Sequence, residues 1–303
     1  MFTFKKDNNI AVAKIVGGKQ DGQIIYLQND PDNHHQCDKQ EISSKTCIHC
    51  GKQFARPDSM KRHVDNNACR IAFAKTYMKK REQENSKTFD SLVVPDGKLQ
   101  VLPMIRKDQR NCIYVSGCAG SGKSKWVGDY LKAGQKINKK DIFLFSHVED
   151  DNAFKDIGNN LNQISLDDEF LEEPIDVNKE MHNSVLVFDD IDSLTGDMAK
   201  EVKRIQDTAL KIGRHSNIDI INTNHLSTDS MKTKTLLNEA NAFVIYPKGS
   251  SKMSLDRLLK NYIGLNQKTI DKICAMKSRW VYIYRNYPQF IVNEHQICNI
   301  DNV

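Results

Sequence analysis

The residues of this sequence with the most specific chemistry form a glycine-rich loop that ends in lysine and serine. The loop comprises Gly117, Cys118, Ala119, Gly120, Ser121, Gly122, Lys123 and Ser124. Its spacing matches G-x-x-x-x-G-K-[ST], in which glycines allow backbone N–H groups to surround a phosphate. The motif predicts that Lys123 bridges the β- and γ-phosphates of ATP and that the Ser124 hydroxyl binds Mg²⁺.

Two carboxylates at the end of an apolar run could complete the same site. The run SVLVF is followed directly by Asp189 and Asp190. Asp189 is predicted to hold Mg²⁺ through water, and Asp190 is predicted to polarise the attacking water. Glu149, which follows an earlier apolar run, is an alternative base, because spacing alone does not decide between it and Asp190.

Two further polar positions lie around the apolar run IDIINTN. Asn224 ends this run, where motor ATPases carry a polar sensor for the γ-phosphate, although a plain polar turn explains it equally well. Arg214 stands shortly before the run. Its predicted role is to neutralise transition-state charge, in its own site or in a neighbour's, or else to act as a cation at a helix C-terminus.

A second group of residues has the spacing of a zinc finger. Its four candidate Zn²⁺ ligands are Cys47, Cys50, His63 and Cys69. The spacing C-x2-C-x12-H-x5-C is typical of a module with two strands and one helix around the metal. Reduced cysteines in a loop are the alternative interpretation.

The finger lies in the most basic part of the chain. Residues 45–80 hold nine Lys or Arg and two acids, a balance of +7, whereas the whole chain has a formal charge of +5. The candidate DNA contacts on the finger helix are Arg56, Ser59, Lys61 and Arg62. Arginine can read guanine in the major groove, but a lone finger could equally bind phosphates or a protein.

From about residue 92 onward, apolar runs alternate with helical stretches, which predicts an α/β fold with a mainly parallel sheet. Strands are expected at 112–117, 142–147, 184–190, 218–224 and 242–247, and in SRWVYIYRN and QFIVN. Helices are expected at 123–133, 197–212 and 251–276, with a break near Gly264. In chain order one strand intervenes between the loop strand and the Asp189 strand, which is typical of additional-strand ATPases related to RecA.

The pattern divides the chain into three parts. Residues 1–44 are expected to form a β-hairpin, built from 10–28, and a loop. Residues 45–84 are expected to form the zinc finger and a basic helix, and residues 85–303 a P-loop ATPase domain. A GTPase is not expected, because INTNHLSTDS, after the fourth strand, lacks the Asn-Lys-x-Asp guanine signature.

Length and composition set outer limits on the class of protein. The 303 residues, 27% of them charged and 39% hydrophobic, are ordinary for a globular protein of about two domains. No apolar run approaches the roughly 18 residues of a membrane-spanning helix, and the N-terminus lacks the apolar stretch of a secretory signal. We therefore expect an intracellular or virion protein without membrane partners or disulfides.

Four segments together resemble the poxvirus-type virion DNA-packaging ATPases of large DNA viruses, within the FtsK/HerA group. These segments are GCAGSGKS, VLVFDD, GRHSNIDIINTNHL and SRWVYIYRNYPQFIV, and the resemblance covers about residues 92–295. It implies a homo-oligomeric ring that uses ATP to move double-stranded DNA into a capsid, with a capsid or portal-vertex protein as partner, in the virion or the viral factory of the host cytoplasm. In that group a glutamine often follows the fourth strand, where this chain has Asn224 and His225.

Two other functions are compatible with these motifs. A replication helicase or initiator ATPase would share both nucleotide motifs and the finger. A nucleotide-gated DNA-binding scaffold with negligible turnover would need the phosphate loop but not the complete set of Lys123, Ser124, Asp189 and Asp190.

Overall fold

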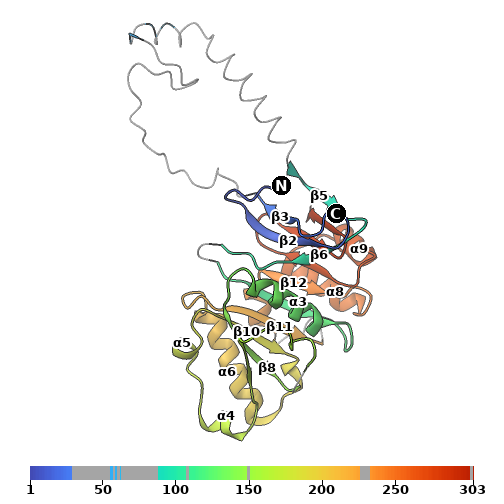
Figure 1. Cartoon of the computed structure of the whole chain (residues 1–303). Helices are drawn as coiled ribbons and strands as arrows, with labels where there is room; N and C mark the ends of the chain where they lie inside the picture. The colour runs from blue at the N-terminus through green and yellow to red at the C-terminus, as the bar shows by residue number, and fades with distance from the viewer. Residues whose placement is uncertain are drawn as a thin grey trace.

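The apolar runs of the sequence form the centre of a large β-sheet in the computed structural model (Figure 1). The structure describes residues 1–28, 55–56, 59, 62, 88–106, 109–148, 151–225, 233–300 and 303. Among these residues the larger sheet has ten strands and a second sheet has five. The result is a mixed α/β fold with a large central sheet, as expected.

Six neighbouring strands of the larger sheet run parallel. In spatial order they are β12 (Ala242–Ile245), β7 (Cys112–Ser116), β11 (Asp219–Asn224), β10 (Ser184–Asp189), β8 (Asp141–Ser146) and β9 (Leu161–Ile164). Antiparallel strands continue the sheet beyond β12 in the order β13 (Val281–Tyr284), β14 (Phe290–Asn293), β15 (Gln296–Asn299) and β5 (Ser91–Val93). In the sheet, the strand between β7 and β10 is therefore β11, whereas β8 lies on the outer side of β10.

The smaller sheet joins two stretches that are distant in the sequence. Its order is β4 (Thr88–Phe89), β1 (Phe2–Thr3), β3 (Ile24–Leu27), β2 (Ile10–Val16) and β6 (Lys98–Val101). β2 and β3 form the antiparallel pair expected for residues 10–28. The predicted domain boundaries at 44 and 84 both lie outside the described residues.

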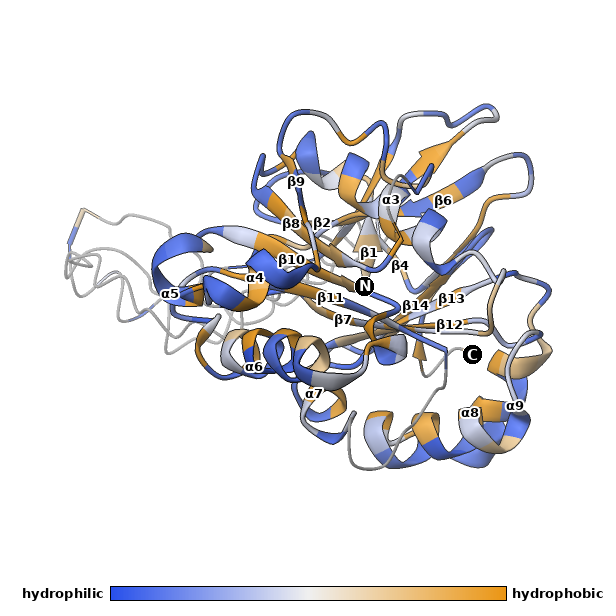
Figure 2. Cartoon of the chain, turned by 90° about the horizontal axis from the view of Figure 1, so that it is seen from below, coloured by the Kyte–Doolittle hydropathy of each residue, from blue (hydrophilic) through white to orange (hydrophobic). Residues whose placement is uncertain are grey.

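Helices cover both faces of the larger sheet. They are α3 (Lys123–Gln135), α4 (Asp168–Glu172), α5 (Val177–Glu180), α6 (Gly196–Ile212), α7 (Lys234–Glu239), α8 (Lys252–Leu258) and α9 (Gln267–Ala275), with short turns of other helix types at η2 (Ile191–Ser193) and η3 (Leu259–Ile263). Figure 2 shows α6, α7, α8 and α9 on one side of the strands and α3 on the other. The break expected near Gly264 is present, because η3 ends at this glycine with φ 84°.

Alternation along β7 divides the core into two parts. Ile113 and Val115 face α3 and the smaller sheet, where they join the cluster that contains Trp126. Cys112 and Tyr114 face the opposite way, into the cluster formed with α6 to α9. Both faces of β7 are thus buried, as expected for a parallel strand covered by helices, and the loop that follows the strand has a rigid base.

In the described part of the chain, no helix is long and apolar enough to cross a membrane.

Candidate functional site

The parallel register brings the carboxyl ends of β7, β11 and β10 to one edge of the sheet. Ser116 at the end of β7 pairs with Asn224 of β11, and Asn222 pairs with Phe188 of β10. The glycine-rich loop leaves β7 at this edge, and Asp189 ends β10 beside it. The residues predicted from two separate motifs therefore meet in one place.

Glycine is required at two positions of the phosphate loop. Gly122 has φ 101°, in the left-handed region, and it is the residue directly before α3. A Cβ at Gly117 would lie 2.7 Å from the Ser121 hydroxyl and 2.8 Å from the Tyr246 ring. The buried Ser121 Oγ has no hydrogen-bond partner among the described residues, which leaves its bonding capacity to a ligand.

Lys123 is buried, and its ammonium group contacts three acceptors. Its Nζ lies 3.1 Å from the carbonyl oxygen of Gly117, 3.3 Å from His225 Nδ1 and 3.3 Å from Asp190 Oδ1. A lysine ammonium has three protons, so each contact can use one of them. Any phosphate that binds Lys123 must compete with Asp190 and His225.

Ser124 and Asp189 place two oxygen ligands side by side. The Ser124 hydroxyl donates to Asp189 Oδ2 over 3.2 Å. Asp189 is buried, and this burial raises the pKa of its carboxyl above the ordinary value, with the Asp190 charge acting in the same direction and the hydrogen bonds from Thr223 and Ser124 opposing it. A hydroxyl and a carboxylate are the hard oxygen donors that Mg²⁺ prefers, so this pair fits the predicted metal.

Thr223 connects the two aspartates from the neighbouring strand β11. Its fully buried hydroxyl accepts the backbone N–H of Asp190 over 2.8 Å. The same oxygen lies 2.8 Å from Asp189 Oδ1 and 3.1 Å from Asp190 Oδ1, so its single proton is donated to one carboxylate at a time. Thr223 thereby fixes the position of both carboxylates.

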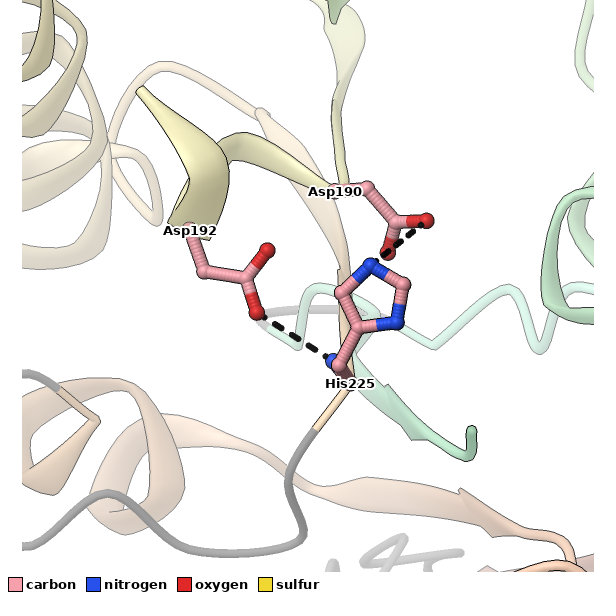
Figure 3. A group of neighbouring side chains, drawn as sticks. All are labelled: Asp190, Asp192 and His225. Atoms are coloured by element: carbon pink, nitrogen blue, oxygen red, sulfur yellow. Dashed lines mark hydrogen bonds and ion pairs between the residues drawn. The ribbon is translucent and has the colours of Figure 1, made fainter. Parts of the chain in front are cut away.

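His225 lies beside Asp190 and Asp192 (Figure 3), and its Nδ1 contacts the Lys123 ammonium. Its Nε2 is 3.4 Å from Asp190 Oδ2, and its backbone N–H donates to Asp192 Oδ2 over 3.3 Å. A neutral ring that carries its proton on Nε2 would donate to Asp190 and accept from Lys123 at Nδ1, so this tautomer satisfies all three groups. Asp190, Asp192 and His225 also form a cluster whose ligand atoms lie within 4.8 Å of one another.

Asn224 contributes to the loop mainly through its backbone. Its carbonyl oxygen accepts the N–H of Gly117 over 3.2 Å, and its side-chain oxygen accepts from the buried Asn222. Asn222 in turn accepts from Gln206 of α6 over 2.5 Å. The sensor role of Asn224 stays a prediction, and the side chain of this segment that reaches Lys123 is His225.

Arg214 lies in the turn between α6 and β11, at the amino end of β11. The phosphate loop adjoins the carboxyl end of β11, and a strand of six residues spans roughly 17–20 Å. Arg214 therefore cannot reach the phosphate loop of its own chain. The last carbonyls of α6 accept hydrogen bonds from Arg110, at Ala209 over 2.6 Å and Leu210 over 2.5 Å.

Most of the predicted finger lies outside the described residues, which applies to Cys47, Cys50, His63, Cys69 and Lys61. The alternative base Glu149 also lies outside them. Among the predicted DNA contacts, Arg56 and Arg62 are exposed, Ser59 is half-buried, and Ser59 N–H donates to the Arg56 carbonyl over 3.2 Å.

Two residues from the far end of the chain also contact the phosphate loop. Arg279 Nε donates to the Ser121 carbonyl over 2.9 Å, and the Tyr246 hydroxyl donates to the Gly122 carbonyl over 2.8 Å. Sequence reasoning assigned neither residue to the site. The available signal was weak, because Tyr246 only ends an apolar run and Arg279 only precedes one.

The fold and the loop together define a mixed α/β protein with a P-loop at the carboxyl edge of a large sheet. The uncharacterized protein V3 of Sputnik virophage is 36% identical over 217 residues, which cover 70% of this chain and 86% of V3. The chain therefore belongs to the same family as V3. No protein-family model matches the chain.

Solved structures resemble the fold at lower identity. The DNA-packaging ATPase B204 of Sulfolobus turreted icosahedral virus has a TM-score of 0.45 and 17% identity, covering 63% of this chain and 98% of B204. The genome-packaging NTPase B204 of Sulfolobus turreted icosahedral virus 2, in complex with AMP, has a TM-score of 0.44 and 18% identity over 63% and 98%. The pCW3 conjugation coupling protein TcpA has a TM-score of 0.39 and 13% identity over 94% and 77%.

The buried hydroxyl of Thr223 offers a direct test of this geometry. Thr223→Val keeps the shape of the side chain but leaves the Asp190 N–H without its acceptor. The free energy of unfolding should fall by about 1–3 kcal/mol, the usual cost of an unsatisfied buried donor. Urea unfolding measures this change.

Thr208→Val on the exposed face of α6 is the control and should change the free energy of unfolding by less than about 0.5 kcal/mol. Equal losses of this free energy in both variants would contradict the role of Thr223.

Proposed function

We propose that this protein hydrolyses ATP and uses the energy to move double-stranded DNA. The observation that carries the hydrolytic part is the convergence of Lys123, Ser124, Asp189 and Asp190 at one sheet edge, with Ser124 3.2 Å from Asp189 and Lys123 3.3 Å from Asp190. A chain that only bound nucleotide would not need an acid beside the lysine. The position of β11 between the P-loop strand and the Asp189 strand supports assignment to the additional-strand ATPases.

The residues present suit ATP with Mg²⁺. The P-loop would hold the β-phosphate through backbone N–H groups, and Ser124 and Asp189 would hold the metal. Bound Mg²⁺ would neutralise negative charge on the phosphates during transfer. The buried Lys123 would provide a second positive charge at the β- and γ-phosphates.

Asp190 is placed to act as the general base. Its side chain is 30% exposed, so water can approach it, whereas Asp189 is buried. When phosphate takes the place of Asp190 at the Lys123 ammonium, the Asp190 carboxylate becomes free to accept a proton from the attacking water. Thr223 and His225 keep this carboxylate in place through contacts of 3.1 and 3.4 Å.

Duplex DNA as the substrate is supported by charge and by motif resemblance. The basic balance of +7 in residues 45–80 offers a phosphate-binding surface, and the exposed Arg56 and Arg62 belong to it. The resemblance of four segments to virion DNA-packaging ATPases points to genome packaging into a capsid by a homo-oligomeric ring, with a capsid or portal-vertex protein as its partner. Zn²⁺ held by Cys47, Cys50, His63 and Cys69 is part of the same proposal.

The hydrolytic site predicts a separation between binding and turnover. Lys123→Ala should weaken ATP binding by at least about tenfold, since it removes a charged hydrogen-bond donor at the phosphates. Asp190→Asn should leave ATP affinity largely unchanged and lower kcat by about 100-fold or more, the usual contribution of a general base. Steady-state hydrolysis and equilibrium ATP binding measure the two effects, with exposed Asp197→Asn on α6 as the matched control. Wild-type turnover in Asp190→Asn would move the base to Glu149.

The substrate is tested with the same assay. Duplex DNA should raise the wild-type rate more than single-stranded DNA does, and the protein should move on blunt duplex without separating the strands. Strand separation on a forked duplex would instead favour the helicase, and a rate indistinguishable from background with every DNA would favour the scaffold.

The position of Arg214 predicts complementation between subunits. Because Arg214 cannot reach its own phosphate loop, a catalytic Arg214 must act in a neighbour's site. Mixtures of Arg214→Ala and Lys123→Ala subunits should therefore recover part of the activity that each variant lacks alone. Sizing by light scattering confirms assembly of the mixtures. Assembled mixtures without any recovered turnover would exclude a catalytic role of Arg214 in a neighbour's site.

The zinc finger predicts one Zn²⁺ per chain. Cys50→Ser should abolish zinc binding, measured by metal analysis of the purified protein, and leave basal ATP hydrolysis unchanged, because the metal would fold only residues 45–80. Affinity for duplex DNA should also fall, with a shallower dependence on salt as phosphate contacts are lost. Retained affinity with the same salt slope would make the module a protein-docking surface instead.

A further inference from the structure

A cavity of about 630 Å³ lies against the phosphate loop, away from Asp189 and Asp190. Its lining comprises Cys118, Ala119, Gly120, Ser121, Tyr246, Lys248, Gly249, Lys277, Ser278 and Arg279. One wall is therefore the loop itself, and the other comes from the segments after β12 and before β13. A cavity of this size is within the range that holds small-molecule ligands.

The charge of this cavity differs from that of the neighbouring one. The cavity that contains Lys123 and Ser124, about 530 Å³ in volume, is lined by four carboxylates, those of Asp129, Asp151, Asp156 and Asp190, and by three lysines, Lys123, Lys125 and Lys132. The cavity beside Tyr246 has three cationic groups, Lys248, Lys277 and Arg279, and no carboxylate among the described residues that line it. The charged groups that line the second cavity are all cationic, whereas carboxylates and lysines nearly balance in the first, so the second cavity favours an anionic group more strongly.

The sheet order gives the direction in which a nucleotide would extend. Asp189, the proposed Mg²⁺ ligand, ends β10, two strands from β7 on one side, so a γ-phosphate bound beside that metal would point that way. β12 is the neighbour of β7 on the opposite side, and Tyr246 directly follows it. The α-phosphate and the nucleoside of the same nucleotide would then extend away from Asp189, toward β12 and the cationic cavity.

Arg279 is held at the junction between the loop and this cavity. Its backbone N–H donates to Glu294 Oε2 over 2.8 Å, and its Nε donates to the Ser121 carbonyl over 2.9 Å. Burial acts to raise the pKa of Glu294, but the Arg279 N–H, Lys98 and Ser278 together lower it below its ordinary value, so the residue is a carboxylate. A Cβ on Gly122 would lie 3.1 Å from a terminal guanidinium nitrogen, which shows how closely Arg279 borders the loop.

We propose that the cavity lined by Tyr246, Lys248, Lys277 and Arg279 binds the α-phosphate and nucleoside of the nucleotide whose outer phosphates contact Lys123. This inference rests on the proposed nucleotide-binding function and names the residues that recognise the inner half of the substrate. Arg279 and the two lysines provide positive charge at the α-phosphate, and the remaining volume holds the ribose and base.

The test compares ligands that do and do not reach this cavity. Binding of ATP and of inorganic pyrophosphate, each with Mg²⁺, is measured by calorimetry on the full chain. Lys248 and Lys277 are exposed, so Lys248→Ala/Lys277→Ala leaves the core intact, and exposed Lys268→Ala on α9 is the control. Arg279→Ala is measured as well.

The double variant should bind ATP about 10- to 100-fold more weakly, with pyrophosphate affinity unchanged within about threefold. Lys123→Ala should lose affinity for both ligands, and Lys268→Ala for neither. Unchanged ATP affinity in both cavity variants, or equal losses for ATP and pyrophosphate, would overturn the cavity assignment while the proposed function stands. Wild-type protein that binds ATP through this cavity without hydrolysing it would overturn the proposed function alone, and absence of ATP binding would overturn both.

Discussion

The candidate site depends on the parallel register of three strands, β7, β11 and β10. Adjacent strands lie about 4.8 Å apart, so the insertion of β11 holds Asp189 roughly 10 Å from the strand that leads into the phosphate loop. Lys123 and Ser124, at the start of α3, reach across this gap. The Thr223 hydroxyl lies at the end of the middle strand and hydrogen-bonds to both aspartates. A register shift of one residue in β11 would turn this hydroxyl to the other face of the sheet and leave both carboxylates without it.

Buried amides extend this arrangement to the far face of the sheet. Gln206 of α6, Asn222 and Asn224 form a hydrogen-bonded chain that ends at the N–H of Gly117. Gln206 and Asn222 are almost fully buried, so a break in the chain would leave polar groups without partners. The position of α6 is therefore tied to the conformation of the phosphate loop. α6 begins shortly after Asp190, at the carboxyl edge of the sheet, and ends just before Arg214, at the amino end of β11. The helix therefore connects the two edges of the sheet.

Local sequence patterns predicted the parts of the fold that depend on local interactions. They did not predict contacts between segments that are distant in the sequence. The P-loop, the apolar strands and α6 follow from glycine spacing, unbroken apolar runs and helical periodicity. α3 continues through Gly134, where an end was expected, and β9 was not expected because LNQI is half polar. The pairing of β1 with β4 joins residues more than 80 positions apart, and no local pattern encodes it.

The sequence showed His225 only as one of several polar residues at a strand end. Which of these side chains faces the site depends on the strand register, and the sequence does not give that register. Arg279 meets Ser121 across 158 positions, through the order of β12 and β13 in the sheet.

The backbone at Asp190 shows how the site maintains an unfavourable conformation. Asp190 has φ 49° and ψ 38°, a left-handed conformation that costs a non-glycine residue about 1–3 kcal/mol. Four contacts hold it there: its N–H donates to Thr223, and its carboxylate contacts the Thr223 hydroxyl, Lys123 and His225. A phosphate at Lys123 would remove one of these contacts, but the bond from the Asp190 N–H to Thr223 involves the backbone and would remain. The carboxylate could then change partners without loss of the turn, which is the property that a general base beside a phosphate-binding lysine requires.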